Sequence, residues 1–310
     1  MTTAVVRALM AQSAIIAVLL TVVADQVAHT HVERLGGVNI WGYRGPVLHQ
    51  KKPNEIRVAV VGGDLSFGWG VAASEALAPS VRQLVALAID RPGTTAVTVV
   101  TSVTIGVRGL APDEYAAWID RYAYLRPDVI CVVPDPIGHV PTAGRFVPDR
   151  RSRAFATFGY SPILPLLLEE KAAAVHSPVR RMLGEALDWI DGLGTRPRRA
   201  QAVAFDSAYL DALQAAVRAG LRAASGVVVV FAPHEQDGFD RGRVRQVLAS
   251  TEGAHRVRVV DLATDPRMHD DGLRLDGFSF STAGHAVAAQ NVTPAVLDLI
   301  RERDTTERRP

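Results

Sequence analysis

The sequence predicts a three-layer α/β/α sandwich on a mostly parallel, doubly wound sheet, preceded by a hydrophobic N-terminal helix. The first observation is a set of short apolar, β-branched runs, such as residues 56–61 and 128–133, which are typical of strands covered by helices on both faces. The second is that segments with helical apolar spacing separate these runs, which predicts right-handed βαβ units. The third is length: 310 residues, 48% of them hydrophobic, suffice for one large domain with a buried core.

The N-terminal segment is apolar. Residues 8–24 carry no charge, and this stretch of 17 residues is at the short end of the roughly 17–25 that cross a bilayer. Arg7 precedes the stretch, which favours an N-in, C-out orientation. An uncleaved signal anchor competes with a signal peptide cut after Ala24, because Val22 and Ala24 are small residues at the positions that a peptidase inspects. A buried core helix is a third interpretation.

Length and flanking residues favour the first two interpretations over the third. Residues 1–28 are therefore expected to be a signal anchor or a signal peptide. The remaining chain is expected outside the cytoplasm, either held on the cytoplasmic membrane by a single span or secreted.

The other elements are expected in a regular order. A lead-in covers residues 29–55, one domain covers residues 56–301, and a polar tail covers residues 302–310. Strands are expected at 56–61, 96–101, 128–133, 227–231 and 257–260. Helices are expected at 74–90, 112–125, 206–224 and 282–301. Ser281 or Thr282 is expected to be the N-cap of the last helix.

Residues 138–200 interrupt this alternation and are expected to form a helical insertion. The segment combines clusters of arginine with apolar stretches such as residues 163–168. Such a segment suits a lid over the active face or a surface that rests on an anionic membrane. An ordinary helical excursion with solvated arginines is slightly favoured.

Charge and cysteine content exclude several classes of function. The 34 basic and 32 acidic residues nearly balance, so nothing indicates a nucleic-acid partner. Cys131 is the only cysteine and lies in an apolar run, which indicates a buried thiol. No disulfide within the chain and no zinc cluster are expected, and the sequence suggests no cofactor or metal.

Four short segments point to a family. The turn after the first strand reads Val60-Val-Gly-Gly-Asp-Leu-Ser-Phe-Gly-Trp-Gly-Val71, the second strand is followed by Gly106-Val-Arg-Gly109, and the last helix is preceded by Asp276-Gly-Phe-Ser-Phe-Ser-Thr-Ala-Gly-His285. These three segments, with the lead-in from Asn39 to Pro46, resemble the ordered motifs of SGNH/GDSL-type hydrolases, in particular their bacterial membrane-anchored members. The resemblance covers residues 37–300 except for the insertion.

The resemblance implies a fold of the SGNH-hydrolase or flavodoxin-like type and chemistry on small acyl esters. In such sites a serine after the first strand attacks the acyl carbon, and a histidine oriented by an aspartate takes its proton. The oxyanion is held by the serine amide, a glycine amide and an asparagine.

Position by position, this chain departs from that pattern. The nucleophile position holds Asp64 and the base position holds Ser279, while Asp276 keeps the orienting carboxylate. Gly109 keeps one oxyanion amide, but the segment after the third strand, residues 134–139, contains no asparagine. A carboxylate is a poor nucleophile toward esters and a serine hydroxyl is no base near neutral pH, so loss of activity by many orders of magnitude is expected.

Several alternatives remain at the sequence level. Ser66 becomes a nucleophile if the turn shifts by two residues, although a hydrogen bond within the turn is favoured. His285 is a candidate base inside the last helix, although a structural role is favoured. Loop residues after the strands are candidates for binding the substrate or, less favoured, a divalent ion. The substrate-binding candidates are Gly63, Asp135, His139 and His234, and the ion candidates are Asp64, Asp135, His139, His234 and Asp276.

Two functions therefore compete. In the first, the chain is an SGNH-like domain with a degraded triad that binds an acylated glycan, a lipid or a protein partner. In the second, it is an active esterase or acyltransferase that acts on cell-envelope glycans or lipids through a rearranged site. The residues favour the first function and the resemblance alone favours the second.

Overall fold

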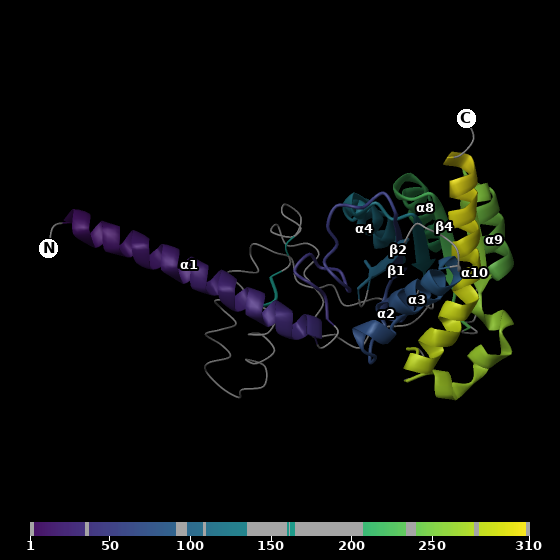
Figure 1. The fold of residues 1–310 in the computed structure, drawn as a ribbon, viewed down its shortest axis with the longest axis horizontal. Coiled ribbons are helices and arrows are strands. Elements are labelled where there is room, and N and C mark those ends of the chain that lie inside the picture. Colours follow the sequence, from purple (N-terminus) through teal and green to yellow (C-terminus); the bar gives the residue numbers. More distant parts are fainter. Residues whose placement is uncertain are drawn as a thin grey trace. The chain divides into compact units, whose positions relative to one another are not determined.

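The computed structural model describes residues 3–34, 37–90, 98–107, 110–134, 160, 162–164, 207–233, 240–275 and 279–307 (Figure 1). The chain divides into two compact units. The first contains the described residues up to Gly42 together with Tyr160 and residues 162–164. The second contains the described residues from Tyr43 to Pro134 and from Ser207 onward.

The second unit is built on a parallel sheet. Its described strands are β1 (Glu55–Gly62), β2 (Val99–Thr104), β3 (Val129–Val133), β4 (Gly226–Phe231) and β5 (Val257–Asp261). They pair in parallel in the order β2-β1-β3-β4-β5. This is the flavodoxin-like doubly wound order, in which the direction of winding changes between β1 and β3. All eight residues of β1 are buried, as expected for a central strand covered on both faces.

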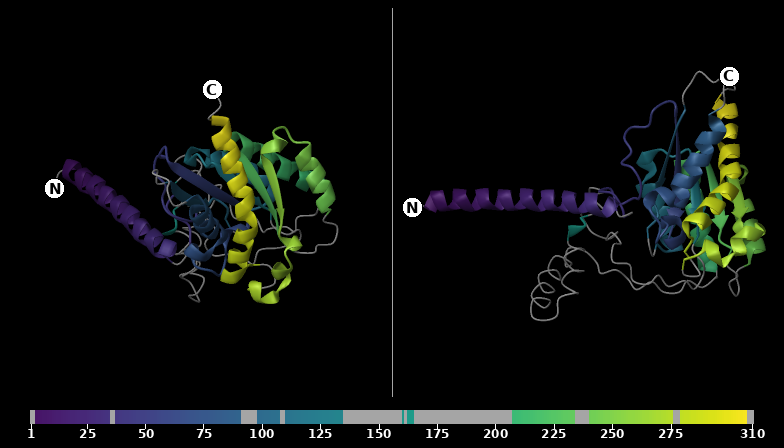
Figure 2. Two further views of the ribbon diagram at one scale, coloured as in Figure 1. Left: turned by 45° about the vertical axis from the view of Figure 1, so that its right-hand side comes forward. Right: turned by 60° about the horizontal axis from the view of Figure 1, so that its bottom comes forward.

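Helices cover both faces of this sheet. On one face lie α3 (Leu77–Ile89) and α10 (Thr282–Glu307), which pack against each other. On the other face lie α4 (Tyr115–Arg121) and α8 (Ser207–Ala223), with α9 (Arg241–Ala249) beside α8. Figure 1 shows α3 and α10 in front of the sheet, and Figure 2 shows the same layers from two further directions. The predicted three-layer α/β fold is thus confirmed.

Element boundaries differ from the sequence prediction at several points. The second strand begins at Val99 rather than at residue 96. The helix predicted at 112–125 is α4 flanked by two 3₁₀ turns, Pro112–Glu114 and Ala123–Leu125, and Arg126 ends the second turn with a left-handed φ of 52°. The short helix α2 (Asp64–Phe67) and α9 were not predicted. Only Val244 and Leu248 of α9 are buried, which is too sparse a pattern to signal a helix.

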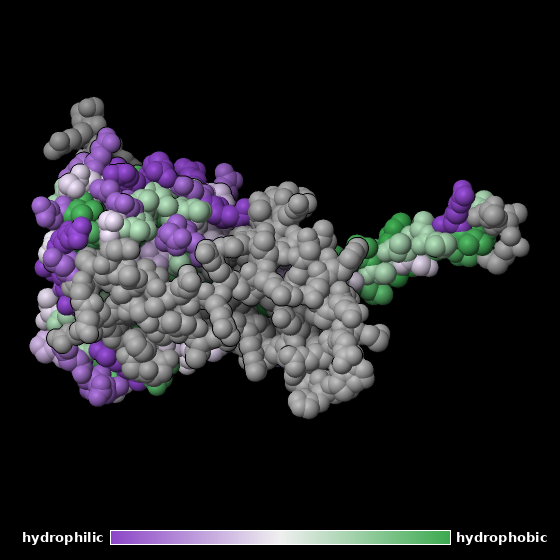
Figure 3. Space-filling view, turned by 180° about the vertical axis from the view of Figure 1, so that it is seen from behind, coloured by the Kyte–Doolittle hydropathy of each residue, from purple (hydrophilic) through white to green (hydrophobic). Residues whose placement is uncertain are grey.

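The first unit contains α1 (Thr3–Arg34), a single helix of 32 residues. Its residues 4–31 are long and apolar enough to cross a membrane or to act as a signal. Figure 3 shows the largely hydrophobic surface of this helix. The predicted apolar segment, residues 8–24, lies inside α1, but the helix extends beyond it at both ends. The extension follows because polar residues after Ala24 remain compatible with a helix and no Pro or Gly interrupts it before Arg34.

Candidate functional site

The candidate site lies at the carboxyl end of the sheet, where β1 and β3 end side by side. Gly62, the last residue of β1, pairs with Val133, the last residue of β3. A Cβ atom on Gly62 would lie 2.1 Å from the carbonyl oxygen of Val133, so only glycine permits this approach. In open parallel sheets, ligand-binding groups collect at such a change of winding.

Asp64 stands at the first position of α2, directly after β1. Gly63 is the N-cap of this four-residue helix, and Asp64 is its acidic first residue. The Asp64 side chain is buried, with 4% of the residue exposed. The carboxylate therefore lies at the strand end where the resemblance implies a nucleophilic serine.

Ser66 lies on the same turn but is closed off from substrate. It is fully buried, and its Oγ donates a hydrogen bond to the Gly63 carbonyl oxygen at 2.9 Å. Gly106 closes the other side, because a Cβ atom there would lie 2.5 Å from Ser66 Oγ. The hydrogen bond within the turn that was favoured for Ser66 is thus observed, and its hydroxyl is bonded to a carbonyl rather than to a histidine.

His285 lies one turn into α10 and is fully buried. Among the described residues, neither of its ring nitrogens has a hydrogen-bond partner. Its ring meets Phe280 edge-on, with 5.5 Å between centroids. Burial, and secondly the nearby Arg44 charge, lower the pKa of His285 to about 4. The imidazole is therefore neutral near pH 7 and is not hydrogen-bonded to Ser66.

Gly284, beside it, has a packing role. A Cβ atom at Gly284 would lie 2.2 Å from the Leu273 carbonyl oxygen. The amide of Gly284 donates to Ser281 Oγ at 3.2 Å, which identifies Ser281 as the side chain that caps α10. Glycine at position 284 thus has a local structural reason, whereas the structural role favoured for His285 stays a prediction.

Arg44 is a buried cation that sequence reasoning did not single out. Its guanidinium donates to the carbonyl oxygens of Phe67, of Gly68 at 2.8 Å and of Val71 at 2.7 Å. It also lies over the Phe67 ring, 4.8 Å from the centroid. Burial lowers its pKa to about 10, so it stays charged at neutral pH. Arg44 fixes the turn that carries Asp64 and Ser66.

The arginine lies within the lead-in segment from Asn39 to Pro46 that the resemblance already included. Its partners are 23–27 residues further along the chain. A separation of this size leaves no local pattern in the sequence, so only the fold reveals the contact.

Ser279, at the base position, lies three residues before α10. Arg274 and Phe280 form an isolated antiparallel bridge around it, and the Leu275 amide donates to the Ser279 carbonyl oxygen at 2.9 Å. Ser279 is buried, with 4% exposed. The base position thus holds a buried hydroxyl side chain.

The remaining predicted site residues are outside the described part of the chain. The structure therefore brings together Gly63, Asp64 and Ser66 on one turn. His285 lies near Gly68, since a Cβ atom added to this glycine would lie 3.2 Å from His285 Nε2. Within the described ranges, no three His, Cys, Asp or Glu side chains cluster as metal ligands would. Outside the described residues are Gly109, Asp135, His139, His234 and Asp276.

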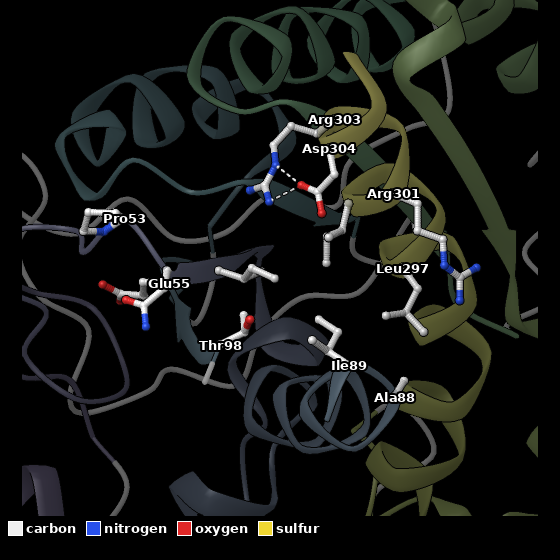
Figure 4. A pocket seen from close by; sticks show the side chains of 12 residues that line it. Pro53, Glu55, Ala88, Ile89, Thr98, Leu297, Arg301, Arg303 and Asp304 are labelled. Carbon is white, nitrogen blue, oxygen red and sulfur yellow. Dashed lines mark hydrogen bonds and ion pairs between the residues drawn. The ribbon is translucent and has the colours of Figure 1, made fainter. Parts of the chain in front are cut away.

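A separate cavity of about 330 Å³ lies at the amino end of β1 and β2 (Figure 4). Glu55, Ile89, Thr98 and Leu297 are among its lining residues. Figure 4 shows Arg303 beside Asp304, with an N–O distance of 2.6 Å, at the end of α10. This cavity is at the opposite end of β1 from Asp64 and contains none of the predicted site residues.

Comparisons with known proteins give distant matches only. No family model and no curated protein matches the chain. Among solved structures, TesA is 10% identical, with 78% of this chain and 99% of TesA covered and a TM-score of 0.43. An acetyl xylan esterase from Geobacillus stearothermophilus is 15% identical, with 78% and 94% covered and a TM-score of 0.43. A family 3 carbohydrate esterase from Clostridium thermocellum is 14% identical, with 80% and 98% covered and a TM-score of 0.35. Two of these three structures are esterases by name, and the identities and TM-scores are too low to transfer an activity or a substrate to this chain.

Proposed function

We propose that this chain is a membrane-anchored, SGNH-hydrolase-like domain that binds an acylated glycan or lipid on the outer side of the cytoplasmic membrane and does not hydrolyse it. The coarse part of this statement, the α/β fold with an N-terminal helix apolar enough to cross a membrane, is described above. The finer part concerns the chemistry at the end of β1. One observation carries it: Ser66 and His285 are not hydrogen-bonded to each other.

Acyl transfer by a serine needs a base within hydrogen-bond reach, about 2.6–3.2 Å from the hydroxyl. Ser66 Oγ instead donates to the Gly63 carbonyl oxygen at 2.9 Å. His285 is buried, has no hydrogen-bond partner among the described residues, and packs edge-on against Phe280. Asp64, at the nucleophile position, would yield a mixed anhydride with an acyl group, which is a high-energy intermediate. These arrangements support binding without turnover.

Exposed apolar side chains at the same edge support the binding role. Trp69, two residues after Phe67, is 40% exposed, and Leu275 is 52% exposed. Leu275 lies over Gly70, where a Cβ atom would be 2.6 Å from its Cδ1. The exposed Trp69 and the exposed Leu275 over the adjacent Gly70 offer a surface for the apolar face of a sugar or for an acyl group. We infer that the ligand contacts Trp69 while its acyl group approaches Asp64.

The test uses the full chain purified in detergent. We expect p-nitrophenyl acetate and acetylated oligosaccharides to be hydrolysed at the buffer rate, and Ser66→Ala and His285→Ala to leave that rate unchanged. Turnover by the wild-type chain that disappears in either variant contradicts the proposal. A titration of the acetylated oligosaccharide, with the deacetylated one as control, measures the binding.

A gain-of-function pair sharpens the test. Asp64→Ser with Ser279→His restores a hydroxyl and an imidazole at the two altered positions. If those two changes account for the missing chemistry, ester hydrolysis rises by about 10²-fold or more over background, the contribution of a positioned base. The matched control, Asp64→Asn with Ser279→Ala, removes the same native groups without supplying new ones and is expected to remain inactive.

A further inference from the structure

Helix α1 changes character at Asp25. Every side chain from Ala4 to Ala24 is exposed. After that point a buried stripe begins, with Asp25 at 4% and His29 at 1% exposure. The two are one helical turn apart, so they lie on the same face of α1. The largely apolar part of the helix up to Ala24 is thus exposed along all its faces, whereas the part that follows buries one face.

The buried part surrounds the Asp25 carboxylate. Asp25 Oδ1 accepts hydrogen bonds from the amides of Ile163 at 2.9 Å and Leu164 at 2.7 Å. Asp25 Oδ2 accepts one from the Tyr160 hydroxyl and lies 3.6 Å from His29 Nε2. The His29 and Tyr160 rings pack with their centroids 5.9 Å apart. All of these residues belong to the first unit, so the carboxylate joins α1 to a segment about 135 residues later in the chain.

The length of the exposed part matches a bilayer. Residues 4–24 are 21 residues, which in a helix span about 31 Å at about 1.5 Å per residue, close to the roughly 30 Å of a hydrocarbon core. Arg7 is the one charged residue among them, and because it lies near the start of the span, its long side chain can place the charge among the lipid headgroups. Asp25 is the first acidic residue of the chain. A carboxylate in hydrocarbon is costly, whereas one bound by two amides and a hydroxyl from the folded chain is satisfied.

We propose that Asp25 lies at the membrane surface, that residues 4–24 of α1 cross the bilayer, and that α1 is retained as the helix on which the segment at residues 160–164 docks. The proposal concerns the anchor and the insertion, and it does not depend on the chemistry proposed for Asp64 and Ser66. Cutting the chain after Ala24 would remove the helical turn that precedes Asp25 and place a new amino group beside its carboxylate. Retention of α1 keeps the docking surface intact.

Thiol labelling in native membranes tests the boundary. The native Cys131 is fully buried, and burial raises its pKa to about 12, so it provides a silent background. With a membrane-impermeant maleimide, Thr30→Cys is expected to react and Val18→Cys, inside the proposed span, is not. Equal labelling at both positions overturns the proposal. So does an intact mass of the isolated protein that corresponds to a chain beginning at Asp25.

Loss of the carboxylate tests the docking. Ile163→Cys, at a position 2% exposed in the native chain, is expected to label slowly. Adding Asp25→Ala leaves the two amides and the Tyr160 hydroxyl without an acceptor, and we expect labelling of residue 163 to accelerate by about tenfold or more. The matched control is Val27→Ala, on the exposed face at 66%, which should leave the rate unchanged.

A second readout avoids the engineered thiol. Limited proteolysis of the otherwise wild-type chain is expected to cut within residues 160–164 faster in Asp25→Ala than in Val27→Ala. Equal rates in the two variants, by labelling and by proteolysis, contradict the docking role of Asp25. Neither result changes the outcome expected in the ester-hydrolysis assay, so a failure of the docking proposal is distinguishable from a failure of the proposed function.

Discussion

The two ends of the sheet differ in how completely their buried polar groups are hydrogen-bonded. At the amino end, Glu55 and Arg57 pair at 2.7 Å, and Asp128 accepts from the Arg57 amide, from Lys51 and from Arg303 at 2.5–2.7 Å. At the carboxyl end, His285 is buried without a hydrogen-bond partner among the described residues. Satisfied buried charges are typical of structure, whereas buried groups without partners are typical of sites. The comparison therefore separates an end whose buried charges stabilise the fold from the end that carries the proposed binding site.

The largest effect is expected from breaking the amino-end network. Glu55→Gln removes the carboxylate that pairs with Arg57 and accepts from Thr101 at 2.8 Å. Removal of one partner leaves the other as a buried, uncompensated charge, so the free energy of unfolding should fall by about 3–5 kcal/mol. Denaturant unfolding measures it. Arg222→Ala, which breaks an exposed pair with Asp120, is the control and should lower the free energy of unfolding by no more than about 1 kcal/mol. Similar losses in the two variants contradict a special stabilising role of the amino-end network.

The next effect is a pH dependence from the carboxyl end. The folded pKa of His285, about 4, lies below its ordinary 6.5, so the folded chain binds fewer protons than the unfolded one between these values. The contribution of neutral His285 to the free energy of unfolding is fully present above pH 6.5. It is lost as the pH drops toward 4, by on the order of 3 kcal/mol at most. In His285→Asn, the free energy of unfolding, measured with denaturant at several pH values, should change little between pH 6.5 and pH 4. A slope that survives the substitution rules out His285 as its source.

The amino end titrates in a different window. Burial opposes ionisation of Glu55, but hydrogen bonds from Arg57, the Lys52 amide and Thr101 outweigh it and lower its pKa from 4.5 to about 2. Its contribution is therefore present above pH 4.5 and is lost as the pH falls toward 2. In the His285→Asn chain, the remaining acid loss should begin below pH 4.5, which separates the two ends in one titration.

A smaller loss of stability is expected from a change at Arg44. This residue lies at the carboxyl end of the sheet, but its buried guanidinium is hydrogen-bonded, like the buried charges at the amino end. Arg44→Lys keeps the charge but cannot reach three carbonyl oxygens at once, so we expect a loss of about 1.5–3 kcal/mol. Burial is the larger cause of the lowered His285 pKa, so the pH window of His285 should stay in place. A large displacement of that window would mean that the Arg44 contacts, and not burial, keep the imidazole neutral.

The smallest stability effect is expected at Trp69. Its exposed side chain contributes little to the core, so Trp69→Ala should change the free energy of unfolding by no more than about 0.5 kcal/mol. If the indole contacts the ligand, the affinity for an acetylated oligosaccharide should fall by about tenfold, measured by titration. Unchanged affinity removes Trp69 from the proposed binding surface while leaving the stability comparison intact.

Much of the fold was predictable because most strands and helices have a recognisable local pattern of apolar residues. The apolar runs at β1, β3 and β4 identify themselves as buried parallel strands, and the spacing in α8 and α10 identifies helices. The helices α9 and α2 were missed because α9 buries only two side chains and α2, with four residues, is too short to show a helical period. The buried turn of Ser66 was anticipated, but the Arg44 contacts to Phe67 and Gly68 were not. The roles predicted for Asp135, His139, His234, Asp276 and Gly109 stay predictions.

Helix α10 carries a residue of each end of the sheet. His285 lies near its start and Arg303 near its finish, 18 residues apart along one rod, or about 27 Å at about 1.5 Å per residue. Halfway between them, Pro294 interrupts the ladder of backbone hydrogen bonds because it has no N–H to offer. One backbone hydrogen bond is therefore missing between the half of α10 that carries His285 and the half that carries Arg303.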